Sequence, residues 1–130
     1  MGSSEFTGRG LGIVATAAIS AYRFVEFNNT GANLTGAAAA AATDLPGGIA
    51  PEAIAQGASG SVFVDGIGFL EVDGSGTAIA TNDFIKATTG GKGVKATTDG
   101  EFYGAIALEP ASTDGKIIRV RILPCTLEAA

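Results

Sequence analysis

The sequence predicts an all-β fold, a small barrel or sandwich of short strands with two pseudo-symmetric half-repeats and a flexible N-terminal arm. One observation is composition, because the 130 residues include 20 glycines and the large apolar side chains fall in short runs. This pattern is typical of short strands joined by tight turns. The other is an internal repeat, in which Ala18–Val25 aligns with Ala78–Ile85. Two copies are too few for a solenoid, so they favour a compact body with pseudo-twofold symmetry.

Weaker matches extend this repeat, first at the same offset and later at a shifted one. They pair Gly31 with Gly91, Leu34 with Val94, Gly48–Ala50 with Gly104–Ile106, and Gly60–Val64 with Gly115–Arg119. The alternative explanation is chance similarity between strands that are rich in Ala, Gly and Thr.

The expected strands follow the alternation of apolar and polar residues. They are Leu11–Thr16, Tyr22–Phe27, Ser61–Asp65, Phe69–Val72, Phe84–Ala87, Val94–Thr97, Phe102–Leu108 and Ile117–Leu123. Pro124 is expected to end the last strand. The stretch Ala37–Gly47 is expected to be a loop with at most one helical turn, because an isolated helix of about six residues is marginal in water.

These elements divide the chain into three parts. Residues 1–10 are mostly polar and are expected to form a flexible arm, because little apolar surface offsets the entropy cost of ordering them. Residues 11–124 form the β domain, and residues 125–130 form a loose tail. The first six residues have an alternative interpretation as a partial remnant of cloning.

Composition argues against most catalytic and metal-binding classes. The chain has no His, so it can form neither a Ser–His nor a Cys–His nucleophile pair and no histidine-ligated metal site. The single Cys125 excludes an intramolecular disulfide and suits a reducing cytosol. The net charge of −5 repels nucleic acid backbones. Neither a signal peptide nor a membrane-spanning apolar run is visible. We therefore expect no enzyme, cofactor, metal, membrane or nucleic-acid partner.

Three further patterns have a functional and a plain structural interpretation. Asp65, Glu71, Asp73 and Asp83 form an acidic stretch that is either a weak cation patch or, as we favour, a set of solvated turn residues. The Gly-rich strings at 8–12 and 91–93 fail as phosphate-binding loops, because one precedes a strand and the other lacks the required Ser or Thr. Arg119 and Arg121 project from one face of the last strand. They either bind carboxylates of a partner or are simply solvated.

The order of motifs resembles that of the capsid cement, or decoration, proteins of tailed double-stranded DNA phages. The matching residues are Ala78-Ile79, Asp83-Phe84-Ile85, Gly91, Gly93, Gly104–Leu108, Ala111, Gly115 and Ile117–Pro124. The resemblance covers most of Leu11–Pro124. Asn82 stands where the family usually has Gly, and Asn also tolerates a left-handed backbone. The Gly36–Gly47 stretch is longer and richer in Ala than usual.

The resemblance implies a structural protein of the virion that binds the outer surface of the mature head. Such a protein stabilises contacts between major capsid subunits, often as a trimer at symmetry axes, and would be made in the host cytoplasm. The arm is the candidate capsid contact, since an extended segment can add a strand to a sheet edge; a disordered tail is the alternative. The capsid-contact candidates are Ser3, Glu5, Phe6, Arg9 and Leu11, and the partner-contact candidates are Arg119 and Arg121.

A small β-barrel ligand-binding or carrier-type module is the alternative function. A carrier resembling biotinyl or lipoyl domains also has two half-repeats, but it needs an exposed acceptor Lys at a hairpin between them. The junction Asp65–Gly76 contains no Lys, which argues against this class.

Overall fold

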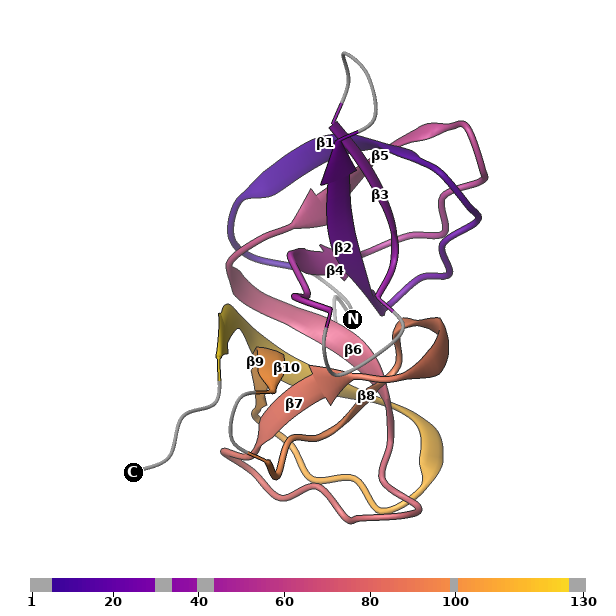
Figure 1. Cartoon of the computed structure of the whole chain (residues 1–130). Helices are drawn as coiled ribbons and strands as arrows, with labels where there is room; N and C mark the ends of the chain where they lie inside the picture. The colour runs from indigo at the N-terminus through magenta and orange to yellow at the C-terminus, as the bar shows by residue number, and fades with distance from the viewer. Residues whose placement is uncertain (1–5, 30–33, 40–43, 99–100, 127–130) are drawn as a thin grey trace.

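The protein consists of two closed β-barrels joined in tandem, as the computed structural model shows (Figure 1). The structure describes residues 6–29, 34–39, 44–98 and 101–126. Strand β6, the first strand of the C-terminal barrel, begins beside the N-terminal barrel (Figure 1). The predicted all-β fold with two half-repeats is thus confirmed, and each half-repeat is a complete barrel.

Each barrel has five strands in the same arrangement. The N-terminal barrel contains β1 (Gly10–Ala15), β2 (Arg23–Asn29), β3 (Leu34–Ala38), β4 (Gly48–Ala50) and β5 (Ser59–Phe63). The C-terminal barrel contains β6 (Gly66–Asp73), β7 (Phe84–Ala87), β8 (Gly93–Lys95), β9 (Phe102–Ala107) and β10 (Asp114–Thr126), with the 3₁₀ turn η1 (Thr89–Gly91) before β8. In both barrels the first strand pairs in parallel with the third and antiparallel with the fifth.

The strong match between Ala18–Val25 and Ala78–Ile85 is confirmed at the level of the backbone. Ile19 forms an isolated bridge with Ile54, and Ile79 forms the equivalent bridge with Ala111. Tyr22 and Asn82 occupy matching positions, and both have a left-handed backbone, with φ of 63° and 77°. The left-handed backbone that an Asn side chain tolerates is therefore present at Asn82, and Tyr22 adopts it as well.

Two of the weaker matches were placed in the wrong register, and Gly31, which was matched with Gly91, lies outside the described residues. Gly36 pairs with Phe27, and Gly93 pairs with Ala87, which is the equivalent of Phe27 in the second copy. Gly36 and Gly93 are therefore equivalent, and Leu34 does not correspond to Val94. Likewise Gly48 pairs with Val25, and Ala105 pairs with Ile85. Because Val25 and Ile85 are equivalent in the repeat, Gly48 corresponds to Ala105, one residue away from the predicted Gly104. Because the segments between strands differ in length between the two copies, small residues gave matches in several registers.

Asn82 offers a direct test of the left-handed position. The Asn82→Ala variant is expected to lose about 1 kcal/mol of unfolding free energy, because a left-handed φ destabilises an L-residue that has a Cβ by about that amount. The Asn82→Gly variant is expected to be as stable as the wild type within about 0.5 kcal/mol, because glycine adopts this conformation freely. Urea unfolding followed by circular dichroism measures both. An alanine variant as stable as the glycine variant would contradict the prediction.

The structure contains two strands that the sequence did not predict, β3 and β4, and most predicted strand ends are shifted by one to three residues. Ala37 and Ala38, expected in a loop, belong to β3 and pair with Glu26 and Val25 of β2. Hydrogen bonding to a neighbouring strand here overrides the helix preference of alanine; residues 40–43 lie outside the described part. Strand β10 continues past Pro124 to Thr126. The register shift between Ile122 and Cys125 accommodates a residue without an N–H.

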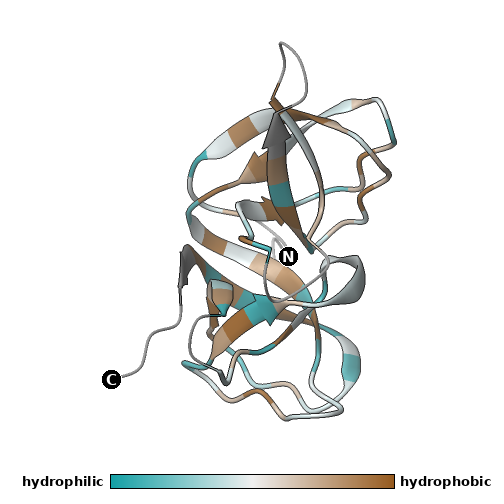
Figure 2. Ribbon diagram, in the orientation of Figure 1, coloured by the Kyte–Doolittle hydropathy of each residue, from teal (hydrophilic) through white to brown (hydrophobic). Residues whose placement is uncertain are grey.

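The two barrels share a hydrophobic core. One cluster fills the N-terminal barrel with side chains such as Ile13, Val25 and Val62. The larger cluster fills the C-terminal barrel and continues into Phe24 and Ile49 of the N-terminal one. Apolar segments recur along the strands of both barrels (Figure 2). This continuity of the core predicts that the two barrels behave as one rigid body.

Close approach of the barrels requires a glycine in β9. A Cβ built on Gly104 would lie 2.6 Å from Cε1 of Phe24 and 2.7 Å from Cβ of Pro46. Any side chain at this position would push the N-terminal barrel away.

Candidate functional site

The described end of the N-terminal segment is packed into the junction between the barrels. The Phe6 ring lies 5.1 Å from the ring of Phe63, 6.2 Å from that of Phe69 and 6.4 Å from that of Tyr22, measured between centroids. Residues 6–10 therefore differ from the flexible arm expected, because burial of one aromatic ring offsets the entropy cost of ordering them. Ser3 and Glu5, two of the predicted capsid contacts, lie outside the described residues.

Backbone pairing holds the same segment against β6. The N–H of Thr7 donates to the carbonyl of Ile67 at 2.8 Å, and the N–H of Ile67 donates to the carbonyl of Thr7 at 2.8 Å. Gly66, at φ +89°, permits this approach, because a Cβ there would lie 1.9 Å from the carbonyl oxygen of Thr7. The Gly-rich string at 8–12 thus leads into the β1 strand, in agreement with its rejection as a phosphate-binding loop.

Arg9 and Leu11 remain on the surface. The backbone N–H of Arg9 donates to Oδ1 of Asp65 at 2.8 Å, and its Nε donates to Oδ2 at 3.0 Å. The backbone hydrogen bond, aided by the guanidinium, holds the pKa of Asp65 below its usual value. The Leu11 side chain is 40% exposed. Of the predicted capsid contacts, Arg9 and Leu11 are therefore accessible to a partner, whereas the Phe6 ring belongs mainly to the interior.

An ion-pair network links the barrels beside this junction. The Arg23 guanidinium of β2 binds Oε1 of Glu71 at 3.2 Å and the carbonyl of Gly90 at 2.9 Å. Lys92 binds Oε2 of Glu71 at 3.5 Å and Oδ1 of Asp114 at 2.9 Å. The backbone N–H of Glu71 also donates to the carbonyl of Tyr22. These contacts fix the N-terminal barrel against β6 and η1.

The acidic residues singled out in the sequence do not converge. Asp65 pairs with Arg9, Asp73 accepts hydrogen bonds from Ser75, and Asp83 lies 3.5 Å from Nζ of Lys95. Within the described ranges, no group of three or more acidic, His or Cys side chains could hold a metal ion. The structure places these carboxylates in separate ion pairs and turns, which supports the plain structural interpretation.

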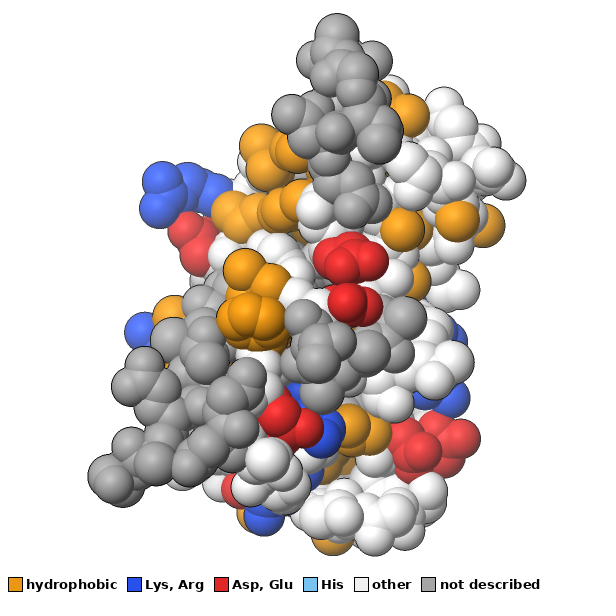
Figure 3. Space-filling model, in the orientation of Figure 1, with side chains coloured by type: hydrophobic (Ala, Val, Ile, Leu, Met, Phe, Trp, Pro, Cys, Tyr) orange, Lys and Arg blue, Asp and Glu red, His pale blue; other side chains and the backbone are white. Residues whose placement is uncertain are grey.

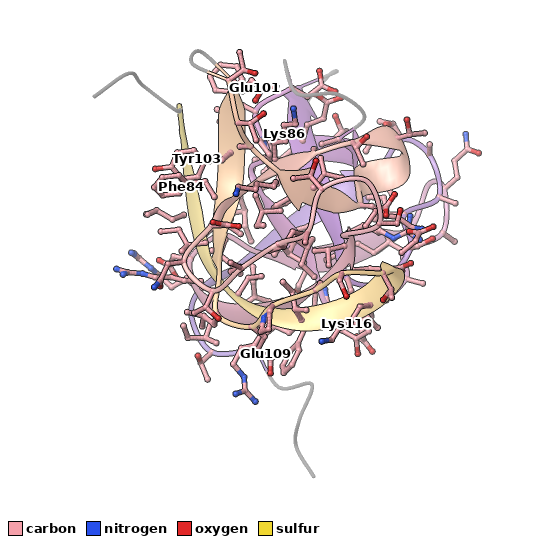
Figure 4. All side chains as sticks on the ribbon, turned by 90° about the horizontal axis from the view of Figure 1, so that it is seen from below. Phe84, Lys86, Glu101, Tyr103, Glu109 and Lys116 are labelled. Atoms are coloured by element: carbon pink, nitrogen blue, oxygen red, sulfur yellow. The ribbon has the colours of Figure 1, made fainter. Side chains whose placement is uncertain are left out.

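The outer side of the C-terminal barrel carries Arg119 and Arg121, the predicted partner contacts. Both arginines are exposed, and the Arg119 guanidinium carbon lies 5.5 Å from the centroid of the Phe69 ring. Seen from below, Phe84 and Tyr103 lie side by side next to β10 (Figure 4), with their ring centroids 4.5 Å apart. Sequence alternation predicted the direction of the arginines but gave no signal for the aromatic rings beside them.

Lys86 and Glu101 form an ion pair near these rings (Figure 4). Burial acting alone would raise the pKa of Glu101, but hydrogen bonds from Lys86 and from the backbone of Thr98 and Thr97 outweigh it. The pKa therefore lies below the usual value. A carboxyl whose folded-state pKa is lowered stabilises the fold above its ordinary pKa, and this stabilisation is lost as the pH falls through the folded-state pKa.

Replacing Glu101 tests this linkage. Glu101→Gln is expected to be less stable than the wild type at pH 7, and the difference is expected to shrink as the pH falls below the ordinary value of 4.5. Thermal unfolding over a series of pH values measures it. The matched control is Glu52→Gln, a change at an exposed side chain, which is expected to follow the wild type. A Glu101→Gln difference that is constant with pH would contradict the prediction.

The visible surface shows mixed charge rather than a single charged patch. Acidic and basic side chains lie close to one another, with apolar side chains between them (Figure 3). In the part of the chain that the structure describes, no helix has the length and apolar character to span a bilayer. The site is therefore best described as two solvent-facing regions, the docked segment with Arg9 and Leu11, and the outer side of β10.

Comparison with known proteins identifies the class to which this architecture belongs. The profile of the phage cement protein family matches residues 6–122. The chain belongs to the phage cement protein family, and it is a structural protein of the phage head. No curated protein matches the chain.

A solved structure with the same fold is described as the head fiber gp8.5 N base in bacteriophage phi29. It is 18% identical to this chain, with a TM-score of 0.71, and the match covers 93% of this chain and 98% of that chain. At this level of identity the likeness supports the tandem-barrel fold alone.

Proposed function

We propose that the protein binds the outer surface of the mature phage head and stabilises contacts between neighbouring major capsid subunits. The observation that carries this proposal is membership of the cement family over residues 6–122. On this proposal the chain acts as a homo-oligomer, with a trimer at capsid symmetry axes as the expected form. It needs no catalytic step and no cofactor.

The physical basis is mass action. A ligand that binds only the mature lattice shifts the equilibrium toward that lattice. When many copies each bridge two subunits, a modest binding free energy per site adds up to a large stabilisation of the whole shell. The shared core and the Arg23–Glu71–Lys92 network support this role, because a rigid bridge transmits force without first losing its own internal contacts.

The carrier-type alternative gains no support from the link between the barrels. This link consists of Val64 and Asp65 between β5 and β6, and it contains no Lys that could accept a prosthetic group.

Electron cryomicroscopy of shells assembled with and without the protein tests the proposal. The expected result is β-rich density on the outer surface at symmetry axes that is absent when the chain is omitted, together with a higher disruption temperature. Unchanged shells without added density would overturn it. The same maps would show whether residues around Arg9 and Leu11 face the shell.

A further inference from the structure

The outer β10 face is a stripe of exposed side chains, with the half-buried Ile106 beside them, on the C-terminal barrel. We define it as Ile117, Arg119, Arg121 and Leu123 of β10, together with Ile106 of β9 and Phe84 of β7. Ile118, Val120 and Ile122 alternate with the β10 members and are buried in the barrel core. The β10 members therefore all point outward.

This face concentrates apolar surface. Ile117 is 44% exposed, Leu123 is 38% exposed and Phe84 is 36% exposed, and these are three of the five large hydrophobic side chains that the described chain exposes. Phe84 pairs with Ile106, and Ile106 pairs with Arg121, so these three residues lie in one row across neighbouring strands. Exposed apolar side chains gathered on one face indicate an interaction site rather than scattered surface residues.

The two arginines of this face have no carboxylate partner among the described residues. The other described basic side chains, apart from Lys116, each pair with a carboxylate: Arg9, Arg23, Lys86, Lys92 and Lys95. The neighbouring acid, Glu109, accepts a hydrogen bond from the backbone N–H of Arg119 at 2.8 Å. A protein with a net charge of −5 thus presents two unneutralised guanidinium groups between apolar side chains.

Arg119 is also held in place before any partner binds. Its guanidinium stacks over the Phe69 ring, which restricts the side chain to the outer surface. A guanidinium that is already ordered loses less conformational entropy when it binds a carboxylate in a bidentate manner.

We propose that the outer β10 face docks on a surface of the capsid shell where two carboxylates lie between apolar side chains. The inference rests on the proposed function and names the surface that performs it. Arg119 and Arg121 are two residues apart on one strand, so the carboxylates would be about 7 Å apart. A twofold contact between two copies of this face would oppose arginine with arginine, which favours the shell as the occupant.

The test compares variants for binding to expanded shells assembled from the major capsid protein of the same phage, measured by co-sedimentation. Arg121→Glu is expected to bind at least about 30-fold more weakly, because a reversed charge leaves the partner's carboxylate buried and repelled. Arg119→Lys is expected to weaken binding several-fold, because Lys keeps the charge but loses the planar fork. Raising the salt concentration is expected to weaken the wild type more than Arg121→Glu.

Lys116→Glu is the matched control. It makes the same change of charge on the same strand, but Lys116 lies at the bulged start of β10 and donates to the carbonyl of Pro110 at 2.9 Å. It is expected to bind shells within about twofold of the wild type, because an exposed charge outside the contact contributes little. Thermal unfolding verifies that each variant is folded, and Arg121 takes part in none of the ion pairs within the described part of the chain.

The outcomes separate this inference from the proposed function. If the wild type fails to bind shells, both the proposed function and this inference are wrong. If the wild type binds and Arg121→Glu binds equally well, only this inference is overturned. If Arg121→Glu lowers the mass of the free protein in sedimentation while each chain binds shells as before, the face contacts a second copy, and the assignment to the shell is wrong.

Discussion

Replacing Phe24 by alanine is expected to lower the unfolding free energy by about 3–5 kcal/mol, the range for a fully buried Phe. Phe24 is fully buried, and it belongs to the cluster that continues from one barrel into the other. Its neighbours Gly104 and Pro46 are held by their own strands and loops, so the surrounding structure is poorly placed to fill the cavity. Guanidinium unfolding followed by circular dichroism measures the loss.

Phe84→Ala is the matched control for this prediction. The Phe84 ring is 36% exposed and its aromatic neighbour is Tyr103, so the expected loss is about 1 kcal/mol. The wild type is expected to unfold in one transition because the core is shared. Equal losses for the two variants would show that the cluster around Phe24 does not hold the barrels together.

Replacing Phe6 by alanine is expected to release the N-terminal segment and to cost about 2 kcal/mol, less than for a fully buried Phe because the ring is only half-buried. Without the ring, the backbone pair between Thr7 and Ile67 is insufficient to keep the segment ordered. Limited trypsin digestion with intact-mass detection measures release, because cleavage after Arg9 requires an extended, accessible backbone.

Leu11→Ala is the control in the same segment. Its side chain is 40% exposed, so the expected change in stability is below about 0.5 kcal/mol and trypsin sensitivity is expected to match the wild type. If Arg9 is cleaved equally fast in the wild type and in Phe6→Ala, the ring does not hold the segment. Any loss of shell binding by Leu11→Ala would instead identify Leu11 as a capsid contact.

The left-handed turns show how much of the backbone conformation can be predicted from local sequence. The short polar side chain of Asn82 tolerates a left-handed backbone, and Asn82 adopts it. Tyr22 adopts it as well, although tyrosine has no such preference. Only its equivalence to Asn82 in the repeat pointed to this conformation, because the bridges Ile19–Ile54 and Ile79–Ala111 impose the same backbone path on both copies.

The candidate contact residues show the same difference between what local sequence predicts and what tertiary contacts decide. The outward direction of Arg119 and Arg121 follows from strand alternation alone. That they lack carboxylate partners among the described residues, and that Phe69 lies beneath Arg119, depends on which side chains other strands bring nearby. Phe6 was placed in a flexible arm because its sequence neighbours are polar, whereas its aromatic partners Phe63 and Phe69 are far away in the chain.

The sequence by itself determined the all-β class, the twofold repeat and the alternating strand β10, because these depend on residues close together in the chain. The tertiary structure decided that each half closes into its own barrel and that Phe24 joins the two cores. It also decided that Phe6 fills the junction. These features depend on contacts between residues distant in sequence, and many pairings of small Ala- and Gly-rich strands look equally good until packing selects one register.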